Sequence, residues 1–144
     1  MIETATARSR RVDYTALAEF RYEIRRFLRV SEEAARRAGL EPQQHQLLLA
    51  LKGAQPGVAP TIRWVAERLQ VQHHSAVGLV DRLAERGMVR RYRDPSDHRR
   101  ALVSLTGAGE SVLEELSRFH QEELRMRAKP LVSAMAAIIR SREP

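Results

Sequence analysis

The sequence predicts a mainly α-helical (α+β) protein, a winged helix-turn-helix with N- and C-terminal dimerisation helices. Apolar residues recur at helical spacing through most of the 144 residues. Between Leu69 and Thr106 the pattern changes: a helix with a polar N-terminal end is followed by two short strands around a Pro/Asp turn. This turn region is rich in arginine. A helix followed by a charged β-hairpin is the arrangement of a winged helix.

The composition favours an acidic partner. The formal net charge is +7, and 23 of the 25 basic residues are arginine. Nucleic acid and an anionic membrane are the two candidates. No apolar run approaches the ~20 residues that span a bilayer, and the first residues carry no apolar stretch, so we expect a cytoplasmic protein without membrane contact. The absence of cysteine excludes disulfides and zinc–thiolate sites.

The N-terminal part is predicted to be an arm followed by one long helix. Residues 1–12 are expected to form a flexible basic arm. Helical spacing then runs from Asp13 to about Ala38 and ends at Gly39, which suits a helix C-cap. A helix of about 25 residues is too long to be covered by so small a core. We therefore expect residues 13–40 to be a dimerisation helix that contacts another subunit.

Residues 41–106 are predicted to form the DNA-binding lobe. Proline suits the first turn of a helix that begins at Pro42 and ends at Gly53. A third helix is expected over residues 62–69, with Thr61 as its cap. The remaining elements are a helix over 73–86 closed by Gly87, and strands at about 88–93 and 100–105.

Residues 107–144 are predicted to be C-terminal dimerisation helices. Thr106 starts a helix with apolar residues at helical intervals, and Pro130 separates it from the last helix, LVSAMAAIIR. This short helix is apolar on nearly every face, and such a helix must be buried. In so small a chain the expected cover is a second copy, which predicts a homodimer.

The helix over 73–86 is the candidate recognition helix. Its apolar residues can face one core, which leaves a polar outer side. The N-terminal residues of a recognition helix contact base edges in the major groove, and the helix N-terminus favours phosphate. The alternative is an ordinary helical hairpin with a polar face. The candidate residues are Gln72, His73, His74, Ser75, Val77, Gly78 and Arg82.

The hairpin YRDPSDHRR is the candidate wing. Asp94-Pro95 suits the start of a turn, and His98, Arg99 and Arg100 are placed on the return strand. Arginine at a narrow turn can enter a minor groove, and Asp97 can direct Arg99 by a charge-assisted hydrogen bond. The alternative is a solvated charged turn. The candidate wing residues are Arg90, Arg91, Arg93, Asp97, His98, Arg99 and Arg100.

Residues 61–109 resemble the DNA-binding core of the MarR (multiple antibiotic resistance regulator) family of bacterial winged-helix regulators. The motifs that carry the resemblance are VAERL, LVDRLAERGMVRR and DPSDHRRALVSLTGAG, and the flanking helices extend it to about residues 13–141. The resemblance implies a homodimeric repressor that binds a pseudo-palindromic operator of double-stranded DNA. Within it, the helix over 73–86 would enter the major groove and Arg99 the minor groove. It further implies release by a small-molecule effector, an aromatic or lipophilic anion.

The chain departs from the family pattern in the candidate recognition helix. Family members often carry Thr/Ser and Arg midway along this helix, where Val77 and Gly78 stand here. Glycine inside a helix costs about 1 kcal/mol relative to alanine. Close approach to DNA or helix packing would each account for it.

The five histidines do not predict a metal site or a cofactor. His73 and His74 are adjacent, so their side chains diverge on a helix, and no three or four ligands converge by spacing. His45 and Trp64 are candidates for an effector cleft, with a packed or solvated histidine and a core tryptophan as the alternatives. No phosphate-binding Gly loop, GxSxG or HExxH motif is found, so we do not expect an enzyme. The alternative function is a winged-helix architectural or protein-interaction module without sequence-specific DNA recognition.

Overall fold

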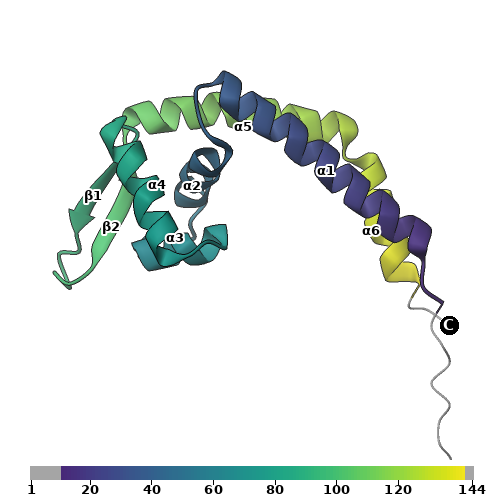
Figure 1. Cartoon of the computed structure of the whole chain (residues 1–144), viewed down its shortest axis with the longest axis horizontal. Coiled ribbons are helices and arrows are strands. Elements are labelled where there is room, and N and C mark those ends of the chain that lie inside the picture. Colours follow the sequence, from purple (N-terminus) through teal and green to yellow (C-terminus); the bar gives the residue numbers. More distant parts are fainter. Residues whose placement is uncertain (1–10, 142–144) are drawn as a thin grey trace, which may run out of the picture. The chain divides into compact units, whose positions relative to one another are not determined.

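The computed structural model describes residues 11–141, which form six helices and a two-stranded antiparallel sheet (Figure 1). The strands pair in a register from Val89 opposite Leu105 to Arg93 opposite Ala101. This confirms the predicted mainly α-helical fold with a winged hairpin. The basic arm predicted for residues 1–12 lies outside the described residues, except for its last two. The elements are α1 (Tyr14–Arg37), α2 (Pro42–Lys52), α3 (Ile62–Leu69), α4 (His73–Glu85), β1 (Val89–Arg93), β2 (Ala101–Leu105), α5 (Gly107–Arg127) and α6 (Lys129–Arg140).

The described residues divide into two compact units. Residues 31–120 form one, here called the winged-helix unit. Residues 11–30 and 121–141 belong to the other, here called the terminal-helix unit. The division falls inside α1 and α5, so each of these helices contributes to both units.

Local signals place the helix ends close to the predicted positions. The Asp13 carboxylate accepts a hydrogen bond from the Ala16 amide at 2.9 Å, and Gly39, two residues after the end of α1, adopts a φ of 82°. The Thr61 hydroxyl accepts from the Trp64 amide at 3.1 Å, as predicted for the cap of α3. One boundary was wrong: Pro130 lies in the first turn of α6 rather than between two helices, because proline fits a helix start.

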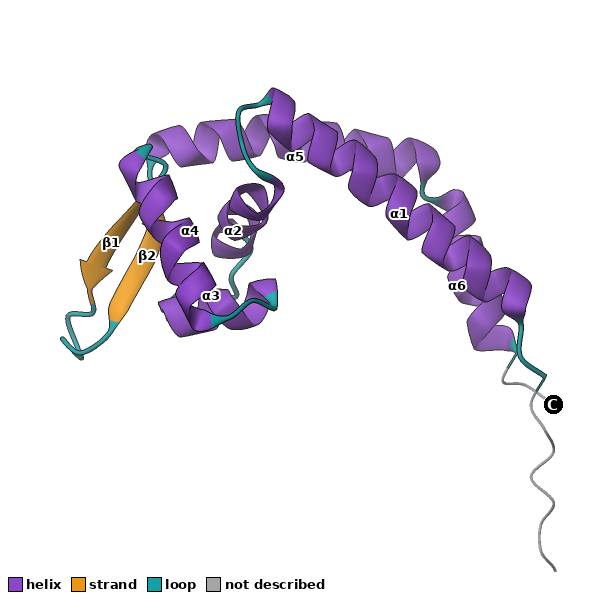
Figure 2. Ribbon diagram, viewed as in Figure 1, coloured by secondary structure: helices purple, strands orange, loops and turns teal. Residues whose placement is uncertain are grey.

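In the winged-helix unit, α2, α3 and α4 lie beside the hairpin (Figure 2). Inward-facing side chains of the helices and the hairpin form its core. The α4 residues predicted to face it, Ala76, Leu79, Val80 and Leu83, are all buried. The hairpin is also joined to the loop before α3, because the Val103 amide donates to the Pro60 carbonyl at 2.9 Å. The hairpin and α4 are thus held by one hydrophobic core.

The terminal-helix unit leaves many large apolar side chains exposed. On α6 the side chain of Ala134 is buried, whereas Val132 and Ile139 are 61% and 66% exposed. On α1 the same unit exposes Tyr14, Leu17, Tyr22 and Leu28. This chain by itself therefore does not bury the apolar helix faces that the sequence predicted to be covered.

Candidate nucleic-acid interface

The N-terminal end of α4 presents polar side chains to solvent. Gln72 precedes the first turn, and it is exposed together with His73 and His74. Ser75 is half-buried. These four residues leave the first turn open to a ligand, because the apolar residues of α4 that follow turn inward.

The middle of α4 is less outward-facing than predicted. Val77 is half-buried and packs against the core, so most of its side chain is used in packing. Gly78 has no side chain, and Arg82 lies one turn later with an exposed side chain. Of these three predicted contact residues, only Arg82 offers a free polar group to solvent.

The outward arginines of β1 differ in their partners. Arg91 forms an ion pair with Asp81, which connects the hairpin to α4. Arg93 donates from Nη1 to the His98 carbonyl at 3.2 Å, across the hairpin. Arg90 is exposed. The Arg91–Asp81 pair could not be predicted from the sequence, because the two residues belong to different elements.

The hairpin turn is organised around Asp94. Its Oδ1 accepts hydrogen bonds from the Ser96 amide at 2.9 Å and the Ser96 hydroxyl at 2.7 Å, and its Oδ2 lies 3.1 Å from Arg100 Nη2. The bonds from Ser96, and then the Arg100 charge, lower the pKa of Asp94 against the opposing effect of burial. Arg100 thus braces the turn. The prediction that residues 98–100 lie on the return strand was wrong, because β2 begins at Ala101 and these residues precede it.

Arg99 is both held and exposed at this turn. Its Nε donates to Asp97 Oδ1 at 3.1 Å, its Nη2 lies 3.5 Å from Asp97 Oδ2, and its amide donates to Oδ1 at 3.1 Å. The Arg99 side chain is nevertheless 91% exposed. The carboxylate therefore restricts the direction of a guanidinium that remains open to a ligand, as the sequence predicted.

Further arginines of the winged-helix unit remain available for an anion. Their side chains are exposed and form neither a hydrogen bond nor an ion pair with another residue in the range 11–141. Such cations can neutralise phosphates without first breaking an internal pair. They include Arg63, Arg68, Arg82 and Arg90.

His45 is a packed histidine and stacks on His120. The ring centroids are 4.9 Å apart at an interplanar angle of 21°, and the His45 side chain is buried. Burial, and then the charge of His120, lowers the pKa of His45 from 6.5 to about 4. The sequence placed these histidines in separate elements and did not predict the stack. Trp64, the other predicted cleft residue, is half-buried and packs against the core.

The residues that the structure describes contain neither a metal-binding group nor a membrane-spanning helix. Within residues 11–141, no three His, Asp or Glu side chains are grouped so that they could hold a metal ion. No helix in the same range is both long and apolar enough to cross a membrane.

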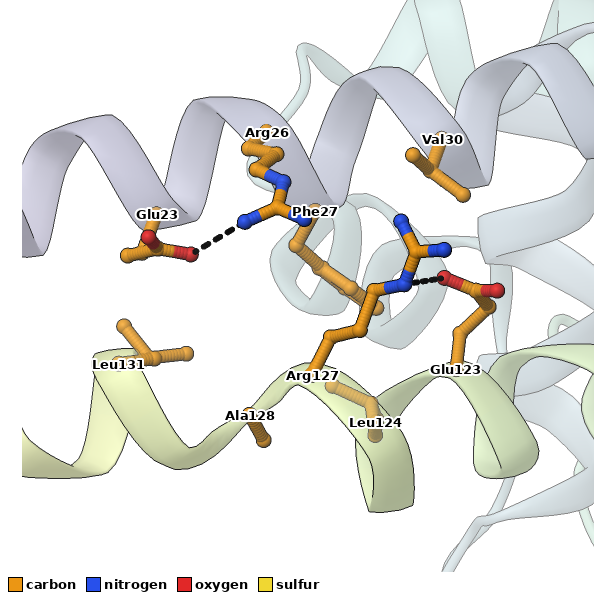
Figure 3. A pocket seen from close by; sticks show the side chains of 9 residues that line it. All are labelled: Glu23, Arg26, Phe27, Val30, Glu123, Leu124, Arg127, Ala128 and Leu131. Atoms are coloured by element: carbon orange, nitrogen blue, oxygen red, sulfur yellow. Dashed lines mark ion pairs between the residues drawn. The ribbon is translucent and has the colours of Figure 1, made fainter.

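A cavity lies between α1 and the α5–α6 region in the terminal-helix unit (Figure 3). Its volume is about 30 Å³. Two ion pairs border it: Arg26 lies 3.7 Å from Glu23, and Arg127 lies 3.6 Å from Glu123. The apolar lining consists of Phe27, Val30, Leu124, Ala128 and Leu131. Neither His45 nor Trp64, the predicted effector-cleft residues, lines this cavity.

Part of this chain matches a protein family, and solved structures share its fold. Residues 38–100 match the MarR family model. No curated protein sequence matches the chain. Among solved structures, the apo form of MarR from E. coli shares 20% identity with a TM-score of 0.67, covering 93% of this chain and 98% of that chain.

Two other similar structures contain ligands. The S. aureus MepR F27L mutant bound to an oligodeoxyribonucleotide has 20% identity and a TM-score of 0.65, covering 90% of this chain and 95% of that chain. CouR from Rhodococcus jostii RHA1 bound to p-coumaroyl-CoA has 28% identity and a TM-score of 0.63, covering 80% and 82%. Over residues 38–100 the chain is thus similar to the MarR family, and it shares the fold of solved structures of MarR-type regulators.

Proposed function

We propose that this protein is a homodimeric, sequence-specific DNA-binding transcriptional regulator that represses from a pseudo-palindromic operator. The observation that carries the proposal is the Arg99 guanidinium, which Asp97 directs while it stays 91% exposed beside a recognition helix with a polar N-terminal end. An arginine so held suits the narrow, electronegative minor groove, and the polar start of α4 suits base edges in the major groove. The oligodeoxyribonucleotide bound in the MepR structure supports DNA as the partner.

The exposed apolar faces of the terminal-helix unit support the homodimer. Exposed contiguous apolar surface on a soluble chain marks an interaction site. A second copy would cover Tyr14 and Leu17 on α1 and Val132, Met135 and Ile139 on α6 by the same surface on both subunits. Two copies of α4 then meet two half-sites about one helical turn apart.

Release by a small aromatic or lipophilic anion is the regulatory part of the proposal. It is supported by two similar structures. One is CouR bound to p-coumaroyl-CoA, and the other is Bordetella bronchiseptica BpsR, whose DNA binding is regulated by 6-hydroxynicotinic acid and which has 23% identity and a TM-score of 0.64. Titration of the protein–DNA complex with a panel of small aromatic carboxylates tests it, with loss of the complex as the expected readout.

Competition between DNA sequences tests the main proposal. A labelled duplex selected from a random library is bound by the full chain and challenged with unlabelled copies of itself or with random duplex of equal length. Preference for the selected duplex, with an inverted repeat in the selected sequences, is expected. Binding should also weaken steeply with salt, because each neutralised phosphate releases counterions. Equal competition by random duplex would instead indicate an architectural module.

A further inference from the structure

The outer face of α4 carries a guanidinium directly over its one glycine. A Cβ built on Gly78 would lie 3.3 Å from Arg82 Nη1 and 3.9 Å from Arg82 Cζ and Nη2. Residues four apart lie on the same face of a helix, and side chains lean toward the helix N-terminus. The Arg82 side chain therefore lies back along α4 over the position of Gly78, and any side chain there would compete with it for this space.

The Arg82 guanidinium carries an uncompensated charge. Its side chain is exposed and forms neither a hydrogen bond nor an ion pair with any residue that the structure describes. The next arginine along the chain, Arg86 directly after α4, differs because it donates to Gln44 Oε1 at 3.2 Å. Arg82 thus occupies the space over Gly78 and keeps its donors for a ligand.

The location of this guanidinium favours a contact with base edges in the major groove over a contact with the phosphate backbone. Position 78 lies one turn after His74 and Ser75, on the face of α4 that continues from its polar N-terminal end. By lying back toward the N-terminus, Arg82 brings its cation about one turn, ~5.4 Å, closer to the end that contacts bases. This is also the part of the helix where the sequence has valine and glycine instead of polar side chains that could contact bases.

We propose that Gly78 provides the space in which Arg82 becomes the base-reading arginine of α4, directed to a guanine in the major groove. The inference rests on the proposed function, since it requires α4 to enter DNA. Guanine is the expected base because the planar guanidinium can donate two hydrogen bonds at once to its O6 and N7 atoms. Glycine at position 78 weakens the helix. The space that it leaves for the Arg82 side chain gives this glycine a function.

The test compares base preference with total affinity. DNA sequences are selected with the wild-type protein, Arg82→Ala, Arg82→Lys and Gly78→Leu, and dissociation constants are then measured on the selected duplex and on single-base variants at several salt concentrations. Arg82→Lys keeps the charge and loses the planar fork. Gly78→Leu fills the space and is a better helix former than glycine, so lost recognition cannot come from a weakened helix.

All three variants should lose the preference for guanine at one position of each half-site, by about tenfold or more. The lysine variant should keep the wild-type affinity for random duplex and the wild-type salt dependence, as it would also do if Arg82 contacted a phosphate. The discriminating result is that lysine should not restore the guanine preference. In the double variant Gly78→Leu/Arg82→Ala, the leucine should add little, because both changes remove the same contact. Melting temperatures confirm that each variant is folded.

Three results would overturn the inference. One is an unchanged base preference in the Arg82 variants. Another is a loss that is uniform across sequences, lowers the salt slope by about one and is restored by lysine, which indicates a phosphate contact. The third is a Gly78→Leu protein with wild-type preference. Failure of the proposed function is a different result, since wild-type protein would then select no sequence at all.

Discussion

The Arg99 guanidinium lies against the Asp97 carboxylate, with Nε 3.1 Å from Oδ1, and yet 91% of the Arg99 side chain is exposed. An exposed ion pair of this kind contributes little to folding, about 0–1 kcal/mol. Its consequence is directional. The turn presents one guanidinium in a limited set of orientations, which lowers the entropy lost when that side chain enters a groove.

Arg99→Ala should therefore weaken binding to the selected duplex by tenfold or more and leave the melting temperature unchanged. Asp97→Asn should give a smaller loss, because the amide oxygen can still accept a hydrogen bond but no longer carries charge. Fluorescence anisotropy with the selected duplex measures both effects. The wing assignment is wrong if Arg99→Ala binds as tightly as wild type.

Asp81→Asn should increase affinity for DNA. The substitution removes a negative charge from α4 and releases Arg91 from its ion pair, so one more cation becomes available to phosphate. Affinity for random duplex should rise and the salt slope should steepen by up to about one, with a stability loss below about 1 kcal/mol. Glu114→Gln is the matched control, because it removes an exposed acid of α5 that pairs with Arg118. Equal effects of the two variants would contradict a specific role for Asp81.

Gly109→Ala should destabilise the protein. A Cβ at Gly109 would lie 2.1 Å from the Met88 carbonyl oxygen and 3.3 Å from Leu105 Cδ2, so the start of α5 would have to move away from the hairpin. Overpacking of this kind costs about 1–3 kcal/mol. Gly107→Ala is the control in the same helical turn, since nothing lies within 4 Å of a Cβ there. Urea denaturation measures the difference, and similar midpoints for the two variants would refute the close contact.

Stability should fall as the pH drops from 6.5 toward 4. In the folded state His45 stays neutral, since burial and the His120 charge lower its pKa to about 4, while in the unfolded chain it takes up a proton near 6.5. The unfolded state then binds more protons, so this group removes up to about 1.4 kcal/mol of stability per pH unit within that window. His45→Phe keeps a ring on the stack and should lower the slope, whereas the exposed His74→Gln should not. Thermal unfolding between pH 4 and 7 measures the pH dependence of stability. An unchanged slope in His45→Phe would contradict the prediction.

Val132→Glu combined with Ile139→Glu should yield monomers. Both side chains are more than half exposed in a single chain, and a charge placed at a covered apolar interface is costly. Sedimentation velocity should show a dimer for wild type and a monomer for the variant. Gln55→Glu, in the exposed loop before α3, adds the same kind of charge outside the terminal-helix unit and should remain dimeric. Wild-type assembly of the double variant would place the dimer interface elsewhere.

The element order and most boundaries followed from local patterns. Helical spacing, Gly39, the Thr61 cap and the alternating strands each act within a few residues, so the sequence could be interpreted segment by segment. The Asp97–Arg99 contact was equally predictable, because the two residues are only two apart in a tight turn.

The partners of the other charged and titratable groups depended on the folded chain. Arg91 could have bound phosphate freely, and only the packing of β1 against α4 places it beside Asp81. His45 and His120 are 75 positions apart, and their stack exists because α2 and α5 bring the rings within 4.9 Å. Arg82 could have extended into solvent. The spacing of four residues allows its side chain to lie over Gly78, but the sequence does not determine that rotamer.

The sequence by itself determined a winged helix with an arginine-rich hairpin, because periodicity, capping residues and turn chemistry are properties of neighbouring residues. Only the tertiary structure decided which cations remain available to a polyanion. That outcome depends on distances between side chains from different elements, and burial and pairing at those distances set both charge and direction.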